Sequence, residues 1–242
     1  MPLQELDQSL PTKKRIFLYG ENGSGKTDLA LSAPGKKLLI DWYGNVLEVA
    51  QRRYASELAN GNIKIVPGPT KWADIDSMVK MPLDPLVEWC DVFVMDNLTG
   101  LYREVTEDVA KNVPLKNSSE RTIPEVVILR DYGLAAERLR YIMGKVMDNI
   151  YTPSAPKKHI IAICHTKLEK DEKGNVVGGG PSLPGQVPAF VLSLFPEQIF
   201  LKCDSNQQRR AHFTQTGYYG AATRVLDGKP IDDPNLSKMY KW

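Results

Sequence analysis

The chain has 242 residues, of which 42% are hydrophobic and 25% are charged. This is the composition of an ordinary globular protein, and it excludes disorder along the whole chain. The formal net charge is only +2, so no global basic field indicates a nucleic-acid partner, and any such contact would have to be local.

Short apolar runs alternate with helical patterns along the chain. The predicted strands are residues 15–19, 37–41, 63–66, 91–96 and 159–164. The predicted helices are residues 26–32, 46–58, 72–87 in pieces, and a long helix from residue 124 with an apolar stripe of Ala135, Leu139, Ile142, Val146 and Ile150. The strands are apolar at successive positions, so both of their faces are expected to be buried. We therefore predict one α/β domain with a mainly parallel sheet flanked by helices.

The C-terminal part of the chain has a different pattern. Residues 168–188 are charged and rich in Gly and Pro, which predicts a long loop. Residues 198–202 and 211–215 predict an antiparallel pair of strands at the edge of the sheet. From residue 227 the sequence is polar and rich in turn-forming residues.

The cysteines and the N-terminal residues indicate the cellular compartment. Cys90, Cys164 and Cys203 are far apart and include no CxxC pair, so we expect reduced thiols rather than disulfides or a zinc site. The first residues lack the apolar core of a signal peptide, and no apolar run approaches the length of a membrane span. We therefore expect a cytoplasmic protein without membrane contact.

A glycine-rich phosphate-binding loop follows the first strand. Residues 20–27 read Gly-Glu-Asn-Gly-Ser-Gly-Lys-Thr, and their position between an apolar strand and a helix fits a P-loop for ATP and Mg²⁺. Lys26 would bind the β- and γ-phosphates, and Thr27 would bind the metal ion. The predicted nucleotide-binding residues are Gly20, Glu21, Asn22, Gly23, Ser24, Gly25, Lys26, Thr27 and Asp28.

Polar side chains follow two further strands. Asp96 closes an otherwise apolar strand, so we predict a carboxylate that binds Mg²⁺ together with Thr27. The alternative is that Asp96 caps the following helix, and both roles are compatible. His165 follows the fifth strand, whose end would face the nucleotide. It is either a sensor of the γ-phosphate or a solvent-facing residue of a turn.

The order of these motifs resembles the RecA-like recombinase core, and most of all the small phage ATPases of that class that act as single-strand annealing proteins, the Sak-type family. The resemblance covers residues 14–235. Besides the P-loop, it is carried by Val-Phe-Val-Met-Asp-Asn-Leu-Thr ending at Thr99, by Ala-Ile-Cys-His-Thr-Lys ending at Lys167, by the glycine-rich stretch 178–185, and by Phe-Thr-Gln-Thr-Gly at 213–217 with Ala-Ala-Thr-Arg ending at Arg224.

The resemblance implies a site and partners. Lys26, Asp96, His165 and Arg224 are the expected catalytic residues, with Arg224 reaching the nucleotide of a neighbouring subunit. It also implies single-stranded DNA as partner and a homo-oligomer with ATP between protomers. A phage-encoded protein would act in the cytoplasm of the host cell. The implied division is an N-terminal arm (1–13), a RecA-like ATP-binding domain (14–226) and a C-terminal tail (227–242).

The sequence departs from the family at two positions. The family carries Asp-x-Glu after the second strand, and its Glu prepares water for attack, whereas this chain has Asp41-Trp42-Tyr43. A tyrosine phenol stays protonated at neutral pH and cannot serve as that base, although Glu48 lies one helical turn further on. The second departure is Ala222, where a lysine is common, and it leaves Arg224 as the basic residue of that segment.

Two loops would bind DNA in such an architecture. Residues 111–123 contain Lys111, Lys116 and Arg121. Residues 166–186 contain Lys167, Lys170 and Lys173 between acidic neighbours, and contacts there would be mainly to phosphate. The alternative for the second loop is a solvated segment with no partner.

The function that the resemblance implies is that of an ATP-binding phage recombination protein, which binds single-stranded DNA and promotes annealing of complementary strands, with weak or DNA-stimulated ATP hydrolysis. One alternative is a non-hydrolysing nucleotide-sensing module of a phage replication or packaging complex, which Tyr43 favours. Another is a P-loop enzyme such as a nucleotide kinase, but the sequence contains no obvious arginine-rich lid.

Overall fold

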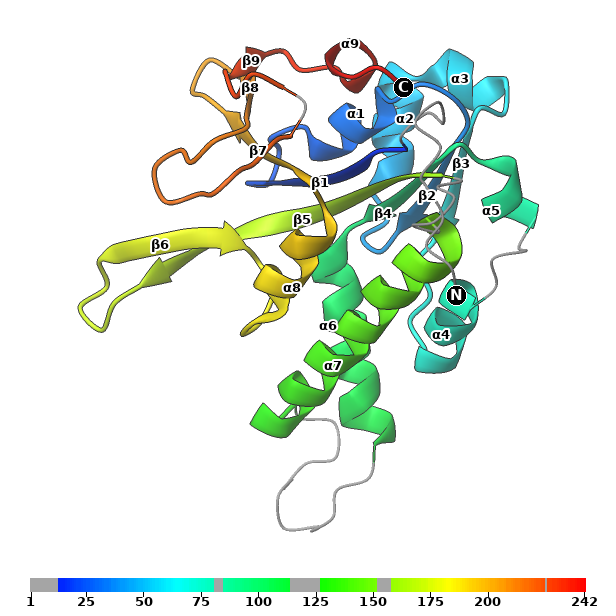
Figure 1. Ribbon diagram of the computed structural model, residues 1–242. Helices are drawn as coiled ribbons and strands as arrows, with labels where there is room; N and C mark the ends of the chain where they lie inside the picture. Colours follow the sequence, from blue (N-terminus) through cyan, green and yellow to red (C-terminus); the bar gives the residue numbers. More distant parts are fainter. Residues whose placement is uncertain (1–12, 81–84, 114–126, 152–157, 225) are drawn as a thin grey trace, which may run out of the picture.

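The computed structural model describes residues 13–80, 85–113, 127–151, 158–224 and 226–242. Within these ranges nine strands form one sheet at the centre of the molecule (Figure 1). The strands are β1 (Arg15–Gly20), β2 (Lys37–Asp41), β3 (Ile63–Pro67), β4 (Val92–Asp96), β5 (His159–Lys170), β6 (Val176–Pro181), β7 (Glu197–Cys203), β8 (Arg209–His212) and β9 (Ile231–Asp232).

The sheet is parallel at its centre and antiparallel at one edge. Its order is β3-β2-β4-β5-β1-β7-β8-β9, and β6 pairs only with the outer part of β5. Every pair from β3 to β7 is parallel, whereas β8 and β9 pair antiparallel to their neighbours. The predicted α/β class, with a mainly parallel sheet and antiparallel edge strands near the C-terminus, is confirmed.

Helices cover both faces of this sheet (Figure 1). They are α1 (Lys26–Leu31), α2 (Val46–Arg53), α3 (Ala55–Ala59), α4 (Trp72–Lys80), α5 (Pro85–Trp89), α6 (Leu98–Asn112), α7 (Leu129–Lys145) with a π-helical continuation (Val146–Tyr151), α8 (Val187–Leu194) and α9 (Leu236–Met239). Successive residues of β1 pack into different hydrophobic cores. Phe17 packs with α6 and α7 on one face of the sheet, and Leu18 packs with α1 and α2 on the other. The strands are apolar throughout because both faces are buried.

Two predicted helices differ in detail. The predicted helix 46–58 is broken at Tyr54, whose backbone leaves the helical region, and it forms α2 and α3. The long helix begins at Leu129, and all five residues of its predicted apolar stripe are buried. Helix α8 had no counterpart in the sequence prediction, because its first residues fall in the predicted loop.

The predicted loop at 168–188 is wrong over residues 168–181, which belong to a β-hairpin of residues 166–181; residues 182–186 form neither strand nor helix. Strand β5 continues past the sheet to Lys170 and pairs with β6, so the two strands project from the body as a ribbon (Figure 1). Asp171 builds the turn by accepting hydrogen bonds from the N–H groups of Lys173 and Asn175. The sequence did not predict strand β6 because it contains three consecutive glycines, and glycine is rare in strands. At Gly179 its absent side chain leaves room for the Tyr219 ring, 2.8 Å from where a Cβ would stand.

The C-terminal residues pack on the body of the domain. Strand β9 extends the sheet, and Leu236 and Tyr240 are buried in the core beside α1. The Leu236 N–H donates a 2.8 Å hydrogen bond to the Ser32 hydroxyl. The division of the chain at residues 13 and 226 stays a prediction. Residues 1–12, and most of the predicted loop 111–123 including Lys116 and Arg121, lie outside the described residues.

Candidate nucleotide-binding site

Residues that form the candidate site come from four parallel strands and meet at the carboxyl edge of the sheet. Gly20 at the end of β1 lies opposite His165 in β5, and Asp41 at the end of β2 lies opposite Asp96 at the end of β4. Since β2 is not a neighbour of β1, the chain crosses over after the first strand. Ligands of open α/β sheets bind at such a change in strand order.

The loop between β1 and α1 has the backbone of a phosphate-binding loop. Gly23 and Gly25 adopt left-handed φ angles of 76° and 88°, which glycine adopts without steric cost. Gly20 runs so close to β7 that a Cβ would stand 2.2 Å from the Leu201 carbonyl oxygen. The sequence therefore needs glycine at these positions to form this loop.

Lys26 lies under the loop rather than in solvent. Its ammonium donates hydrogen bonds to the carbonyl oxygens of Gly20 and Glu21, at 3.0 and 2.7 Å. Burial lowers the pKa of Lys26 to about 8, although the nearby Asp96 carboxylate opposes this shift. The Ser24 hydroxyl is also buried, and within the described ranges it has no hydrogen-bond partner.

Thr27 and Asp96 form the second polar pair of the site. The Thr27 hydroxyl donates a 2.6 Å hydrogen bond to an Asp96 carboxylate oxygen. Burial raises the pKa of Asp96 to about 6, and this hydrogen bond counteracts the rise. A hydroxyl beside a carboxylate suits a Mg²⁺ ion that takes its other ligands from phosphate and water. In the described ranges no three His, Cys, Asp or Glu residues cluster as metal ligands.

Asn97, rather than Asp96, caps the helix that follows β4. Its side-chain oxygen accepts a 2.9 Å hydrogen bond from the Gly100 N–H at the start of α6. The capping role considered for Asp96 therefore falls to its neighbour, and the Asp96 carboxylate faces Thr27. Asn97 also lies 3.1 Å from His165, between its amide nitrogen and the imidazole Nε2.

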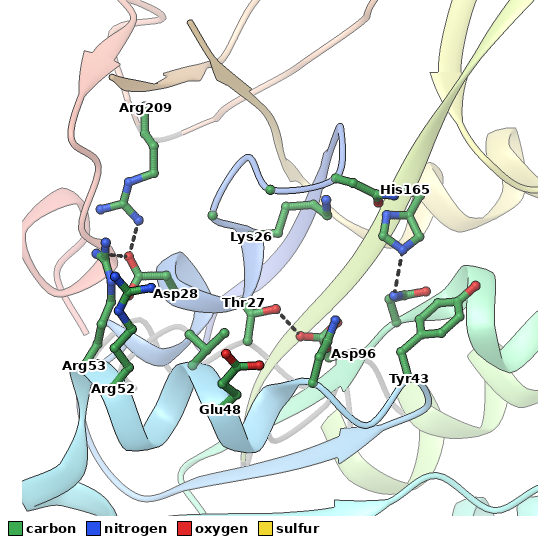
Figure 2. A pocket seen from close by; sticks show the side chains of 16 residues that line it. Lys26, Thr27, Asp28, Tyr43, Glu48, Arg52, Arg53, Asp96, His165 and Arg209 are labelled. Carbon is green, nitrogen blue, oxygen red and sulfur yellow. Dashed lines mark hydrogen bonds and ion pairs between the residues drawn. The ribbon is translucent and has the colours of Figure 1, made fainter. Parts of the chain in front are cut away.

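His165 is a half-buried residue of the cavity wall. Its pKa is lowered, first by burial and then by the Lys26 charge, so the ring is neutral at neutral pH. Its Nδ1 atom is buried and has no partner among the residues that the structure describes. The Tyr43 ring lies beside it, with ring centroids 5.6 Å apart (Figure 2). The histidine therefore belongs to the site and is not a solvent-facing turn residue.

The segment after β2 presents a phenol where the resemblance implies an acid. Asp41 accepts hydrogen bonds from the N–H groups of Tyr43, Gly44 and Val46, at 2.8 to 3.0 Å. Its carboxylate thus shapes the turn into α2. Tyr43 lines the cavity and is 40% exposed, and Glu48 reaches the same wall from α2. Glu48 is the one carboxylate of α2 (Val46–Arg53), and it lines the cavity.

The cavity at this edge holds about 820 Å³ and contains arginines that the sequence did not predict. Arg52 and Arg53 come from α2, and Arg209 comes from β8 (Figure 2). Arg53 donates to Asp28 Oδ2 at 2.9 Å, and Arg209 donates to the same oxygen. No local motif marks Arg209, since only the sheet brings β8 beside α1.

Four predicted site residues lie away from the cavity. The Arg224 side chain is exposed, and the backbone N–H of Arg224 donates a 2.9 Å hydrogen bond to the Glu197 carboxylate. Lys167, Lys170 and Lys173 lie on the projecting hairpin. They do not contribute to the cavity wall.

Comparison with models of protein families matches residues 12–226 to the AAA domain. A search of curated proteins gave no match. None of the helices in the described ranges is long and apolar enough to cross a membrane.

Proposed function

The chain belongs to the AAA domain family of nucleotide-binding proteins, and we propose that it is a RecA-like ATP-binding protein of phage recombination. It binds single-stranded DNA and promotes the annealing of complementary strands. This assignment to the Sak-type annealing proteins rests on the order of motifs in the sequence. The pocket geometry supports the nucleotide part of the proposal, and the hairpin supports the DNA part.

The nucleotide would lie along the P-loop with its phosphates toward Lys26. Loop N–H groups and the positive end of α1 favour phosphate at this place. Thr27 and Asp96 are the residues that would hold Mg²⁺, whose charge would neutralise phosphate oxygens. The neutral His165 imidazole lines the same cavity, and a turn of the ring that frees Nε2 from Asn97 would let it donate a hydrogen bond to the γ-phosphate, which is the part of ATP that ADP lacks.

The continuity of β5 is the observation that carries the DNA part of the proposal. One strand runs from His165 at the cavity to Lys170 near the hairpin tip. A hydrogen bond between His165 and the γ-phosphate can therefore bias the position of the ribbon. The three lysines of the hairpin, Lys167, Lys170 and Lys173, supply cations for a phosphate backbone, and the affinity would fall with salt.

Arg224 is proposed to act on the nucleotide of a neighbouring protomer. It is exposed, and the buried Glu197 carboxylate fixes its backbone. An arginine at a protomer interface can stabilise phosphate charge in trans. The binding of ATP would then be coupled to assembly of the oligomer, because each bound nucleotide would contact two protomers.

A nucleotide-sensing module without hydrolysis is the second candidate, and Asp41 and Tyr43 favour it. The Asp41 carboxylate is committed to the turn, and the phenol of Tyr43 cannot act as base at neutral pH. The arginines of the cavity also bear on the kinase alternative. Arg53 and Arg209 are both tied to Asp28, rather than free on a lid, so they do not favour a kinase.

Annealing of two labelled complementary strands, followed by energy transfer, tests the proposal. We expect ATP with Mg²⁺ to accelerate annealing relative to ADP and to no nucleotide. Lys26→Ala should lose nucleotide affinity while its circular dichroism stays that of the wild type. Lys64→Ala, on β3, is the charge-matched control. ATP binding without any DNA binding or annealing would reject the DNA part and favour the sensing module.

A further inference from the structure

Arg209 begins strand β8, which pairs with the edge strand β9, yet it lines the same cavity as the P-loop. Its side chain lies directly over Gly25, where a Cβ would stand 2.6 Å from Arg209 Cδ and 2.9 Å from Nη1. We infer that Arg209 binds the phosphates of the nucleotide held by its own subunit, with Asp28 as the positioning residue. This inference rests on the proposed binding of a nucleotide.

The surroundings of Asp28 leave positive charge at the cavity wall. Its Oδ2 atom accepts hydrogen bonds from Arg53 and Arg209, while its Oδ1 atom is buried and unpartnered among the described residues. One carboxylate cannot neutralise two guanidinium groups. The Arg209 side chain is 20% exposed against 52% for Arg53. The excess charge is therefore least screened by solvent at Arg209, where an anion would offset it best.

The guanidinium of Arg209 can bind phosphate without leaving Asp28. An arginine has five N–H donors in a rigid fork, and Asp28 takes a hydrogen bond from Nη1. The remaining donors are available for phosphate oxygens, with which arginine forms strong charge-assisted hydrogen bonds. Asp28 restricts the freedom of the side chain, and this pre-organisation lowers the entropic cost of binding.

The position of Arg209 indicates which phosphates it would bind. Figure 2 draws Arg209 and Asp28 at one end of the cavity, and Asp96 and His165 at the other. Since Asp96 and His165 lie at the end proposed for the γ-phosphate, Arg209 would contact the α- or β-phosphate. These two groups are common to ADP and ATP. The contact would therefore contribute equally to the affinity for both nucleotides.

Calorimetric titration of ADP and of ATP with Mg²⁺ tests the inference. We expect Arg209→Gln, which keeps much of the side-chain length, to weaken both affinities by about 10- to 100-fold. Arg209→Ala should do the same. Arg210→Gln is the matched control, because the next residue of the strand faces the opposite side and pairs with Asp232. Circular dichroism and thermal unfolding monitor the fold of each variant.

Four outcomes would contradict the inference or part of it. Unchanged ADP and ATP affinity in folded Arg209→Gln overturns it. A loss for ATP alone assigns the contact to the γ-phosphate, and a loss for single-stranded DNA alone assigns it to the DNA backbone. If the wild-type protein binds neither nucleotide, the proposed function itself fails.

A double-mutant cycle tests the role of Asp28. Asp28→Asn should change ADP affinity in the wild-type background by a different factor than in the Arg209→Gln background, because it acts through that arginine. Equal factors in the two backgrounds reject positioning. A merely structural role of Asp28 would lower the unfolding temperature in both backgrounds without this coupling.

Discussion

The Thr27 hydroxyl at the start of α1 donates a 2.6 Å hydrogen bond to the Asp96 carboxylate at the end of β4. The two residues are separated by 69 positions in the sequence, and the crossover of the parallel sheet brings them together. Asp96 is buried near Lys26; burial lowers the pKa of Lys26 to about 8 and raises the pKa of Asp96 to about 6. The titration of Lys26 and Asp96 determines over which pH range the site can bind a metal–nucleotide complex.

We expect the affinity for Mg²⁺–ATP to be highest between about pH 6 and pH 8. Below about pH 6 the Asp96 carboxyl, whose pKa burial raises to that value, is protonated and cannot bind the metal ion. Above about pH 8 the Lys26 ammonium loses its proton and its attraction for phosphate. Titration of a labelled ATP from pH 5 to pH 9 measures both limits. Repeating the titration with EDTA should remove the acidic limit alone, and an acidic limit that persists would contradict the role of Asp96.

Asp96→Asn should stabilise the protein at neutral pH while it removes the Mg²⁺ dependence of ATP affinity. The folded-state pKa of Asp96 lies above its usual value of 3.8, so the folded state binds the proton more tightly than the unfolded state. The contribution of Asp96 to stability therefore falls as pH rises from about 4 to about 6. A rise in the pKa of Asp96 from 3.8 to about 6 means that the charged carboxylate lowers the free energy of unfolding by about 3 kcal/mol at neutral pH.

Urea denaturation at pH 7.5 and pH 4 measures this effect. The asparagine side-chain oxygen can still accept the hydrogen bond from Thr27, so the variant removes the charge and keeps the contact. We expect the gain in unfolding free energy at pH 7.5 to disappear at pH 4, where the wild-type carboxyl is protonated. A loss of stability at pH 7.5 would show that the Asp96 charge is well compensated in the fold.

The sequence predicted the sheet and the P-loop because their determinants are local. A strand such as β4 is a run of apolar residues, and the P-loop is a short segment whose glycines fix its backbone. Arg209 could not be predicted, since its contact with Asp28 spans 181 positions and depends on which strand pairs with β7. Strand order is a tertiary property that no window of sequence contains.

The hairpin was mistaken for a loop for a related reason. Glycine and charge predict loops on average, yet Gly179 stands in a strand because the Tyr219 ring packs over it. Tyr219 itself stacks on Phe200, with ring centroids 4.2 Å apart. Only this tertiary contact explains the need for a residue without a side chain in β6.

Tyr43→Glu should raise the rate of ATP hydrolysis. The phenol of Tyr43 lines the cavity beside His165, and a carboxylate there could orient and deprotonate water. General-base catalysis contributes about 100- to 10,000-fold, and we expect a gain toward the lower end because the geometry is not optimised. Steady-state phosphate release with and without single-stranded DNA measures the effect.

Tyr43→Phe is the control for this substitution, and it should leave the slow wild-type rate unchanged. Brisk hydrolysis by the wild-type protein would mean that another carboxylate acts as base. Glu48→Gln would then be the first variant to examine, because Glu48 lines the same cavity from α2.

Arg224→Ala should weaken ATP-dependent assembly without altering the stability of the monomer. The residue is exposed, and it is the backbone N–H that is bonded to Glu197, so alanine keeps this hydrogen bond. We expect the unfolding free energy to change by less than about 0.5 kcal/mol. Light scattering with and without ATP measures assembly. Lys229→Ala removes a charge from a side chain that is 84% exposed and should leave assembly intact; equal behaviour of the two variants would reject the role in trans.

Replacing Lys167, Lys170 and Lys173 of the hairpin by alanine should weaken binding of single-stranded DNA uniformly across sequences. Phosphate contacts carry no base information, and each one lost removes about 0.7 from the slope of log affinity against log salt, so three contacts remove about two. Fluorescence anisotropy at several salt concentrations measures the slope.

The ATP affinity of this hairpin variant should stay unchanged, because none of the three lysines lines the cavity. A triple alanine variant at Lys36, Lys64 and Lys71 removes the same charge from other surface positions and serves as the control. If both triple variants lower DNA affinity and slope equally, the effect is one of net charge and the hairpin has no special role. If neither does, the hairpin is a solvated ribbon. A loss confined to the hairpin variant, and larger with ATP than with ADP, is the result expected if His165 transmits the presence of the γ-phosphate along β5.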